Sequence, residues 1–402
     1  MKRSLVLALV LLAGCGQGAA TGGQASPSAS HGAGSPAASS SAATVLFAVS
    51  EGTGQACGSG CQGRLAIVGL DGRVRARTTF NPPKAAVVGC EGGYVTNVVQ
   101  VAAGAVYYMD DTGLVRRLSV SGAITQVARF PIRTSQQLLW LAVSPDGKSL
   151  MAATMVYPPL SASWDPSKGC PVHDAGRTHE ELDLAAAGGS TTTLSDQTDP
   201  QHVMSLGGWD AAGPVAVPDT QLAYIGYIDG TTWGGAAVHL DLHGRPSGVS
   251  IGGSDCQPLF GETRDGHLVC YTPKQPTVRD SAGHVVWTLK ALDPKDEYDY
   301  GVVALSPDAS RVAFRIQKAL SYDSSVIRSR DGTRIGLGST FDPQGWLDDQ
   351  TVIGAQGSLQ PTCVGCPAGF QPTTLGLLSV SAPTQVKDLA ISGRFLGVLS
   401  ST

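Results

Sequence analysis

LAVSPDGKSL at residues 141–150 and VALSPDASRVAF at residues 303–314 share one order: an apolar strand, a Ser-Pro-Asp turn and a second strand. Proline fixes φ within such a turn, and the aspartate side chain can accept hydrogen bonds from the turn backbone. Two copies of one hairpin, far apart in the chain, indicate a fold that is built from repeated β units.

A repeated unit covers the chain from Thr44 onward. It consists of an apolar strand, a connection of variable length, a second apolar strand and a tight turn, such as Asp71-Gly72; only the last turn, Ala382-Pro383, lacks a glycine. The first strands are expected at residues 45–49, 105–109, 150–156, 222–228, 267–271, 311–316 and 351–355, and the second strands at 65–70, 114–120, 182–186, 236–242, 277–279, 325–329 and 374–380. Most units start about 40 to 45 residues apart, as four-stranded propeller blades do.

Two spacings are longer, because residues 157–179 form an insertion and residues 81–83 belong to an extra loop. We therefore predict an all-β chain that folds as a β-propeller of seven four-stranded blades. Six or eight blades, a β-sandwich pair and a smaller barrel are the alternatives.

The two Ser-Pro-Asp hairpins resemble the repeats of TolB-type, WD-repeat-like propellers. In that family the turn leads into the strand nearest the propeller axis, so the resemblance implies this position for the strands that follow Pro145 and Pro307. Two units match by motif and the other five only by period. The resemblance therefore implies a fold and not a function.

The composition fits a ring of short strands joined by many turns. The chain has 402 residues with 51 Gly and 24 Pro, 42% of its residues are hydrophobic, and only 15% are charged. The formal net charge is -4, and no run of Lys or Arg provides a stripe for phosphate binding. We expect no nucleic-acid partner.

The N-terminus predicts export. Lys2 and Arg3 precede an apolar stretch at residues 5–12, and Leu12-Ala13-Gly14-Cys15 closes it. This stretch resembles the lipobox of bacterial lipoproteins, which implies that residues 1–14 are removed as a signal peptide and that the Cys15 thiol receives a diacylglycerol. Eight apolar residues are too few to span a bilayer, which needs about 20, so the lipid would be the anchor. An ordinary secretory signal with a chance cysteine is the alternative.

Residues 16–43 consist almost wholly of Gly, Ala, Ser, Pro, Thr and Gln. Such a composition buries too little apolar surface to offset its ordering entropy, so residues 15–43 are expected to form a lipidated, flexible tether. The predicted organisation is thus a signal peptide, the tether and a propeller domain at residues 44–402. We expect a lipid-anchored monomer on the extracytoplasmic side of the cell membrane.

Eight cysteines remain after Cys15, an even number that favours disulfides in an exported chain. Two pairs are close in sequence, Cys57 with Cys61 and Cys363 with Cys366. The pairs Cys256 with Cys270 and Cys90 with Cys170 follow by elimination. Cross-pairing among the four cysteines of the first and last units, or a zinc site made of these four, are the alternatives.

No common catalytic motif is present, neither a G-x-S-x-G elbow nor a Walker loop, H-E-x-x-H or EF-hand loop. His173-Asp174 with His179-Glu180-Glu181 could hold a metal, but a solvated polar loop is the favoured interpretation. Asp293, Asp296, Glu297 and Asp299 lack the order of a calcium loop and are expected in an exposed loop. We therefore predict no catalytic residue, metal or cofactor.

The longest connections within units are expected to share one face of the ring. They are residues 51–63, 157–179, 229–235 and 356–372, and three of them contain the aromatic residues Tyr157, Trp164, Trp233 and Phe370. Exposed aromatic side chains on loops are common anchors of recognition surfaces. We expect these four residues to bind a partner; the alternative is that they cap the cores of the blades, as we expect for Trp209 and Trp346.

The sequence thus favours a non-enzymatic, surface-tethered lipoprotein that recognises a protein or an envelope glycan through the long-connection face. The alternative is a propeller hydrolase or lyase that acts on extracellular carbohydrate or a small ester. Its catalytic carboxylates or histidines would lie around the channel mouth, where a sequence motif does not mark them.

Overall fold

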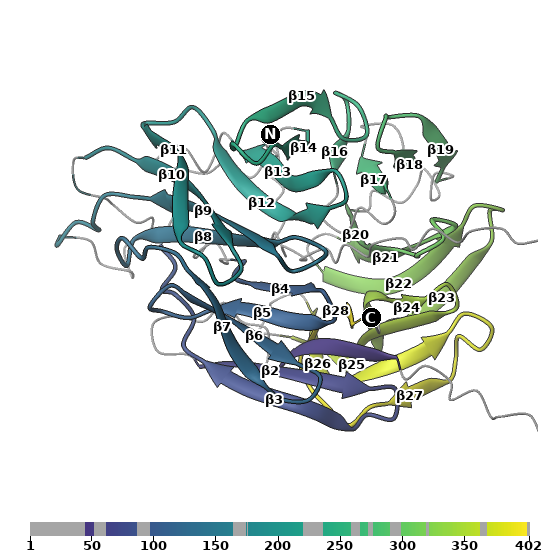
Figure 1. Ribbon diagram of the computed structural model, residues 1–402. Coiled ribbons are helices and arrows are strands. Elements are labelled where there is room, and N and C mark those ends of the chain that lie inside the picture. The colour runs from purple at the N-terminus through teal and green to yellow at the C-terminus, as the bar shows by residue number, and fades with distance from the viewer. Residues whose placement is uncertain are drawn as a thin grey trace, which may run out of the picture.

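The computed structural model describes residues 45–51, 62–86, 97–163, 174, 176–219, 236–258, 266–271, 276–289, 299–318, 321–361 and 368–399. These residues form seven four-stranded antiparallel sheets arranged in a ring (Figure 1). The chain is a seven-bladed β-propeller. Within the described ranges no helix is long and apolar enough to cross a membrane.

Each blade contains four strands, which follow one another from the axis outward. Blade 1 contains β28 (Arg394–Leu399), β1 (Leu46–Glu51), β2 (Gly63–Gly69) and β3 (Val74–Phe80); blade 2 contains β4 (Val99–Ala102), β5 (Ala105–Met109), β6 (Leu114–Ser119) and β7 (Ile124–Arg129). Blade 3 contains β8 (Gln137–Val143), β9 (Ser149–Val156), β10 (His179–Ala186) and β11 (Thr191–Thr198); blade 4 contains β12 (Val203–Asp210), β13 (Gly213–Asp219), β14 (Val238–Leu240) and β15 (Pro246–Ser250). Blade 5 contains β16 (Gln257–Pro258), β17 (His267–Tyr271), β18 (Thr277–Asp280) and β19 (Val285–Thr288); blade 6 contains β20 (Asp299–Leu305), β21 (Arg311–Lys318), β22 (Ser321–Ser329) and β23 (Arg334–Gly338). Blade 7 contains β24 (Phe341–Asp348), β25 (Thr351–Pro361), β26 (Ala368–Ser379) and β27 (Val386–Asp388).

Burial identifies the inner edge of each blade. In blade 3, β8 is buried along its whole length, whereas every residue of β11 is at least partly exposed. The inner strands also contact one another around the ring, as β4 with β8, β8 with β12 and β24 with β28 (Figure 1). A parallel bridge between Asn97 and Trp140 joins blade 2 to blade 3 near the axis.

The Ser-Pro-Asp turns have the predicted hydrogen bonds. The Ser144 hydroxyl donates to Asp146 Oδ1 over 2.7 Å, and Asp146 Oδ1 also accepts the Lys148 N–H over 3.0 Å. The second copy repeats this pattern, with 2.6 Å between the Ser306 hydroxyl and Asp308 Oδ1. One expectation is wrong: each turn follows the strand nearest the axis, β8 or β20, and leads outward into the second strand of the blade.

The C-terminal strand closes the ring. β28 pairs antiparallel with β1, from Leu46 opposite Leu399 to Ser50 opposite Arg394. The last strand of the chain therefore becomes the inner strand of blade 1, whose other three strands come from the N-terminal part of the domain. The repeat predicted from the sequence corresponds to the second and third strands of the blades, except in blade 4, where only the third strand matches.

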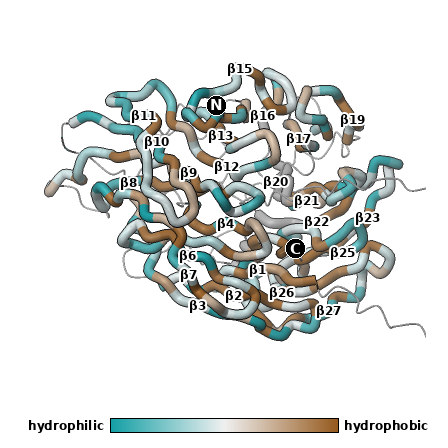
Figure 2. The backbone as a smooth tube through the Cα atoms, viewed as in Figure 1, coloured by the Kyte–Doolittle hydropathy of each residue, from teal (hydrophilic) through white to brown (hydrophobic). Residues whose placement is uncertain are grey.

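The hydrophobic core consists of layers between neighbouring blades, where Figure 2 shows hydrophobic segments along the strands. Trp346 is fully buried between blades 6 and 7, and Trp209 is buried between blades 3 and 4. These two tryptophans belong to the packing of the blades, as expected. Burial of one large apolar side chain contributes roughly 1.5 to 3 kcal/mol, so the layers stabilise the ring.

Two predicted elements differ from the structure, and a third is not tested. The expected strand at residues 222–228 lies outside the described residues, and the strand that pairs with β14 is β13. β10 begins at His179 rather than at Leu182, so the polar residues before Leu182 belong to a strand and not to a solvated loop. The expected connection at residues 356–372 is largely strand, because β25 and β26 pair as far as Pro361 opposite Ala368.

Candidate functional site

The antiparallel order of the strands gives the ring two faces. One face holds the turns between first and second strands and between third and fourth strands, and we call it the turn face. The other face holds the connections between second and third strands, including those of β1–β2, β9–β10, β13–β14 and β25–β26, and we call it the connection face.

The structure does not gather the four predicted aromatic residues into one exposed cluster. Tyr157 is only 2% exposed, because the apolar face of β9 continues to this residue and packs between blades 3 and 4. The expectation of binding is therefore wrong for Tyr157, and the alternative of a core cap is correct. Phe370 is partly exposed on β26, opposite Leu359. Trp164 and Trp233 lie outside the described residues.

A two-stranded ribbon extends from the connection face in blade 7. The inner strand β24 begins at Phe341, which pairs with Gln356, so residues 357–361 of β25 continue beyond the edge of the sheet. They pair with residues 368–372 of β26, from Gly357 opposite Pro372 to Pro361 opposite Ala368. Its side chains include exposed Ser358, Gln360 and Gln371, so the ribbon offers polar groups beside Phe370.

A charged cluster lies on the connection face, where the inner strands begin. Arg315 of β21 donates two hydrogen bonds to the Asp342 carboxylate of β24, over 2.8 and 2.6 Å. Burial raises the pKa of Asp342, and the Arg315 guanidinium counteracts this effect. Arg394 is the first residue of β28, and burial together with the nearby Arg315 lowers its pKa to about 10. The Arg315–Asp342 contact joins blades 6 and 7, and Arg394 lies at the start of the inner strand of blade 1.

Carboxylates of blade 3 serve as ties to its two neighbours. Glu181 binds Arg133, which precedes β8, with a distance of 2.8 Å between Arg133 Nε and Glu181 Oε2. Glu180 points the other way and accepts the Met204 N–H of blade 4 over 2.6 Å. Burial raises the pKa of both Glu180 and Asp183. Glu180 and Glu181 thus contact segments on either side of blade 3, whereas Asp183 stays within the blade and shares the Thr193 hydroxyl with Glu181.

The alternative of a metal at His173, Asp174, His179, Glu180 and Glu181 does not fit the described part of this set. His179 pairs with Asp196, at 3.0 Å between His179 Nε2 and Asp196 Oδ1, while Glu180 and Glu181 lie on opposite faces of β10. His173 lies outside the described residues, and within the described ranges no group of three His, Cys, Asp or Glu is placed to hold a metal ion.

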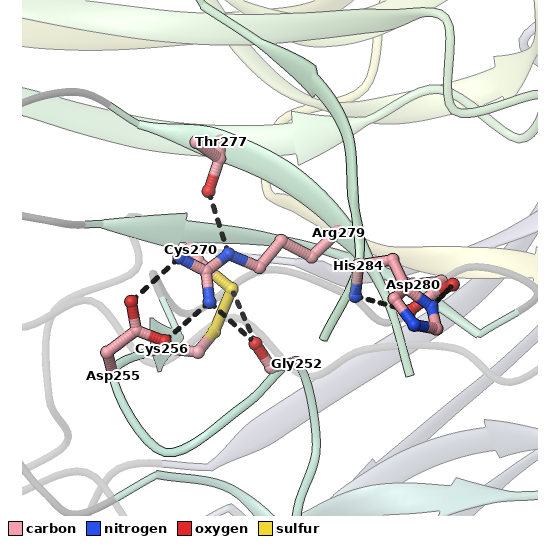
Figure 3. Close-up of polar contacts among 8 residues, drawn as sticks. All are labelled: Gly252, Asp255, Cys256, Cys270, Thr277, Arg279, Asp280 and His284. Carbon is pink, nitrogen blue, oxygen red and sulfur yellow. Dashed lines mark hydrogen bonds and ion pairs between the residues drawn. A yellow bond between two sulfur atoms is a disulfide. The ribbon is translucent and has the colours of Figure 1, made fainter. Parts of the chain in front are cut away.

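Blade 5 contains a disulfide between Cys256 and Cys270, the pairing that the sequence suggested by elimination. Beside it, the buried Arg279 donates to both carboxylate oxygens of Asp255, over 2.6 and 2.9 Å, and to the Gly252 carbonyl over 3.0 Å (Figure 3). These contacts fix the segment before β16. The strand β16 itself has only two residues. Cys57, Cys61, Cys90, Cys170, Cys363 and Cys366 lie outside the described residues.

The sequence analysis missed the charged cluster, because its members are far apart in the chain. Arg315 and Asp342 are 27 residues apart, and no local spacing connects them. The available signal was an isolated charge within an apolar strand, as in VAFRI at residues 312–316 and in GRFLG at residues 393–397. Such a charge needs a partner when the strand is buried.

Comparison with models of protein families finds no match, and no curated protein matches the sequence. Several solved structures have a similar fold. An oligogalacturonate lyase in complex with manganese has a TM-score of 0.44 and 11% identity, covering 77% of this chain and 87% of that chain. TolB from Acinetobacter baumannii has a TM-score of 0.33 and 12% identity, covering 88% of this chain and 65% of that chain.

The β-propeller domain of the Trilobed protease from Pyrococcus furiosus, described as having an open velcro topology, has a TM-score of 0.41 and 10% identity, covering 86% of this chain and 98% of that chain. At such low identity, the similarity of all three structures concerns the fold alone.

Proposed function

We propose that the protein is an exported lipoprotein, anchored to the cell membrane through a lipid on Cys15, whose propeller binds a partner at the connection face. The N-terminal sequence supports the anchor, since the positive residues, the short apolar stretch and Leu12-Ala13-Gly14-Cys15 occur in the order of a lipobox. The binding site consists of the ribbon at residues 357–361 and 368–372 together with the inner-strand ends beside it.

The ribbon is the observation on which the proposed binding role chiefly depends. Its two strands continue beyond β24 and β27. After Gly357, whose N–H donates to the Thr340 carbonyl, their outer edges have backbone N–H and C=O groups that no described strand of the sheet covers. Edges of this kind can accept an added strand, and Phe370 beside them offers apolar surface. The sequence suggested a protein or an envelope glycan as the partner, and these edges favour a protein.

Three described carboxylates near the connection face favour binding over catalysis. Asp342 pairs with Arg315, Glu181 with Arg133 and Glu180 with a backbone N–H, so each carboxylate already has a structural contact. A hydrolase or lyase needs acids and bases that converge around a reacting atom. The carboxylates here instead act as links between blades.

Photo-crosslinking in intact cells tests the binding role. A photoreactive amino acid replaces Gln371 on the ribbon or, as the matched control, Ser247 on β15, since both side chains are exposed. We expect one defined adduct from position 371 and none from position 247. Equal adducts from both positions, or none from position 371, would contradict a binding site at the ribbon.

Mass spectrometry of the mature N-terminus tests the anchor. We expect a peptide that begins with diacylglycerol-modified Cys15 in the membrane fraction, and a Cys15→Ser chain that leaves the membrane. An unmodified Cys15 in a membrane-free chain would contradict the lipoprotein assignment.

A further inference from the structure

The N-terminal segment reaches the propeller on the turn face. Leu46, the first residue of β1, pairs with Gly69 at the end of β2 and with Leu399 at the end of β28. Both partners lie at the turn face, because β2 continues directly into the turn at residues 70–73. The connection face begins at the other end of β1, about 20 Å away for a strand of this length.

Among the described residues, most exposed large apolar side chains lie on this same face. Val74, Val120, Ile124, Leu242 and Val285 are between 37% and 53% exposed, and they flank the turns between third and fourth strands in blades 1, 2, 4 and 5. Among the described residues only one other large apolar side chain is equally exposed, Val249 of β15. Single exposed apolar residues are common, but here five of them lie along one rim of the ring.

Charged side chains beside these apolar residues have partners within the same turns. Arg75 pairs with Asp71, Arg245 with Asp241, and His284 Nδ1 lies 2.9 Å from Asp280 Oδ2, each within one turn of the same face. The aspartates of these turns also accept backbone N–H groups, as Asp241 does from Arg245. A surface with paired charges and exposed valine, leucine and isoleucine suits a neutral lipid interface better than a strongly charged partner.

We infer that the turn face is the membrane-facing side of the propeller, and that its apolar rim contacts the lipid interface. The inference rests on the proposed lipid anchor at Cys15. The composition of residues 16–43 predicts a flexible coil of about 28 residues, and a coil of this length would have a root-mean-square length of roughly 30 Å and would keep its attachment point close to the membrane. The apolar rim, which lies on the face where the tether attaches, then orients the ring. The connection face consequently points away from the membrane, where a partner can reach the ribbon.

Lipid-dependent quenching tests this orientation on the full lipidated chain. An environment-sensitive fluorescent amino acid is placed at Ser121, in a turn of the turn face, or at Gln371 on the ribbon, both of which are exposed. The chain is reconstituted into phosphatidylcholine vesicles that contain a spin-labelled lipid. We expect the lipid to quench position 121 at least about twofold more than position 371, with no change at higher salt concentration.

Variants separate a membrane contact from chance proximity. Replacing Ile124, Leu242 and Val285 by serine is expected to reduce the quenching at position 121 by roughly half or more, since it removes apolar surface from the rim. Val249→Ser is the matched control, because this valine is more exposed but lies away from the rim, and we expect it to leave the quenching unchanged.

The outcomes distinguish the two proposals. If the chain has no lipid and does not float with vesicles, the proposed anchor is wrong. If the lipidated chain floats but positions 121 and 371 are quenched equally, or the triple serine variant and Val249→Ser behave alike, the orientation is wrong while the anchor stands.

Discussion

Asp342→Ala is expected to destabilise the propeller by about 2 to 3 kcal/mol. Asp342 and Arg315 form an ion pair with two hydrogen bonds between blades 6 and 7. Their side chains are 11% and 25% exposed, respectively. Removing one partner of a fully buried pair costs roughly 3 to 5 kcal/mol, because the remaining charge stays buried. The partial exposure of Arg315 lowers this cost, since solvent screens its charge.

A double-mutant cycle of urea unfolding measures this effect. The chains compared are the wild type, Asp342→Ala, Arg315→Met and the double variant. In thermal unfolding, a loss of stability of this size lowers Tm by about 3 °C in a domain this large. We expect the double variant to be more stable than Asp342→Ala alone, because it also removes the Arg315 guanidinium, which loses Asp342 as its partner in Asp342→Ala. A loss below about 0.5 kcal/mol for Asp342→Ala, or simple additivity in the cycle, would rule out an energetic link between the two side chains.

Three further predictions concern single features of the blades. Replacing Cys256 and Cys270 by serine is expected to destabilise the domain by about 3 kcal/mol, because the disulfide joins residues with a sequence separation of 14. In differential scanning calorimetry, the variant should have a lower Tm than the wild type, and a reducing agent should no longer change it. Glu180→Gln is expected to raise the free energy of unfolding at pH 7, because burial raises the pKa of Glu180 and the folded state therefore favours its neutral form. This gain in stability should vanish as the pH falls below the ordinary glutamate pKa. A gain that persists at pH 3 would contradict this cause. Ala309→Gly is expected to stabilise the domain by up to about 1 kcal/mol in chemical unfolding, since Ala309 has a φ of 55°, and a loss of stability would count against strain at this turn.

The sequence predicted the blades because their signals are local. A Ser-Pro-Asp turn has all its hydrogen-bonding groups within six residues, as the Ser144 and Ser149 contacts show. The turn glycines are also local signals, and Gly72 adopts the left-handed φ of 77° that a tight turn requires. Period and turn chemistry together were enough for the number of blades.

The features that were missed depend on long-range pairing. The closure of the ring by β28 needs Leu399 to pair with Leu46 from the other end of the chain. The burial of Tyr157 depends on its neighbours in blade 4, and the length of the ribbon depends on pairing between residues 357–361 and 368–372. Neither an aromatic residue near a loop nor a glycine-rich connection indicates such partners by itself.

Hydrogen exchange of the chain, measured with and without the partner captured from position 371, is the decisive test of a partner site at the ribbon. We predict that the partner slows backbone exchange in residues 357–361 and 368–372 of the ribbon, while the turns at residues 70–73 and 120–123 of the turn face do not change. Slower exchange at the turn face, with the ribbon unaffected, would contradict a partner site on the connection face.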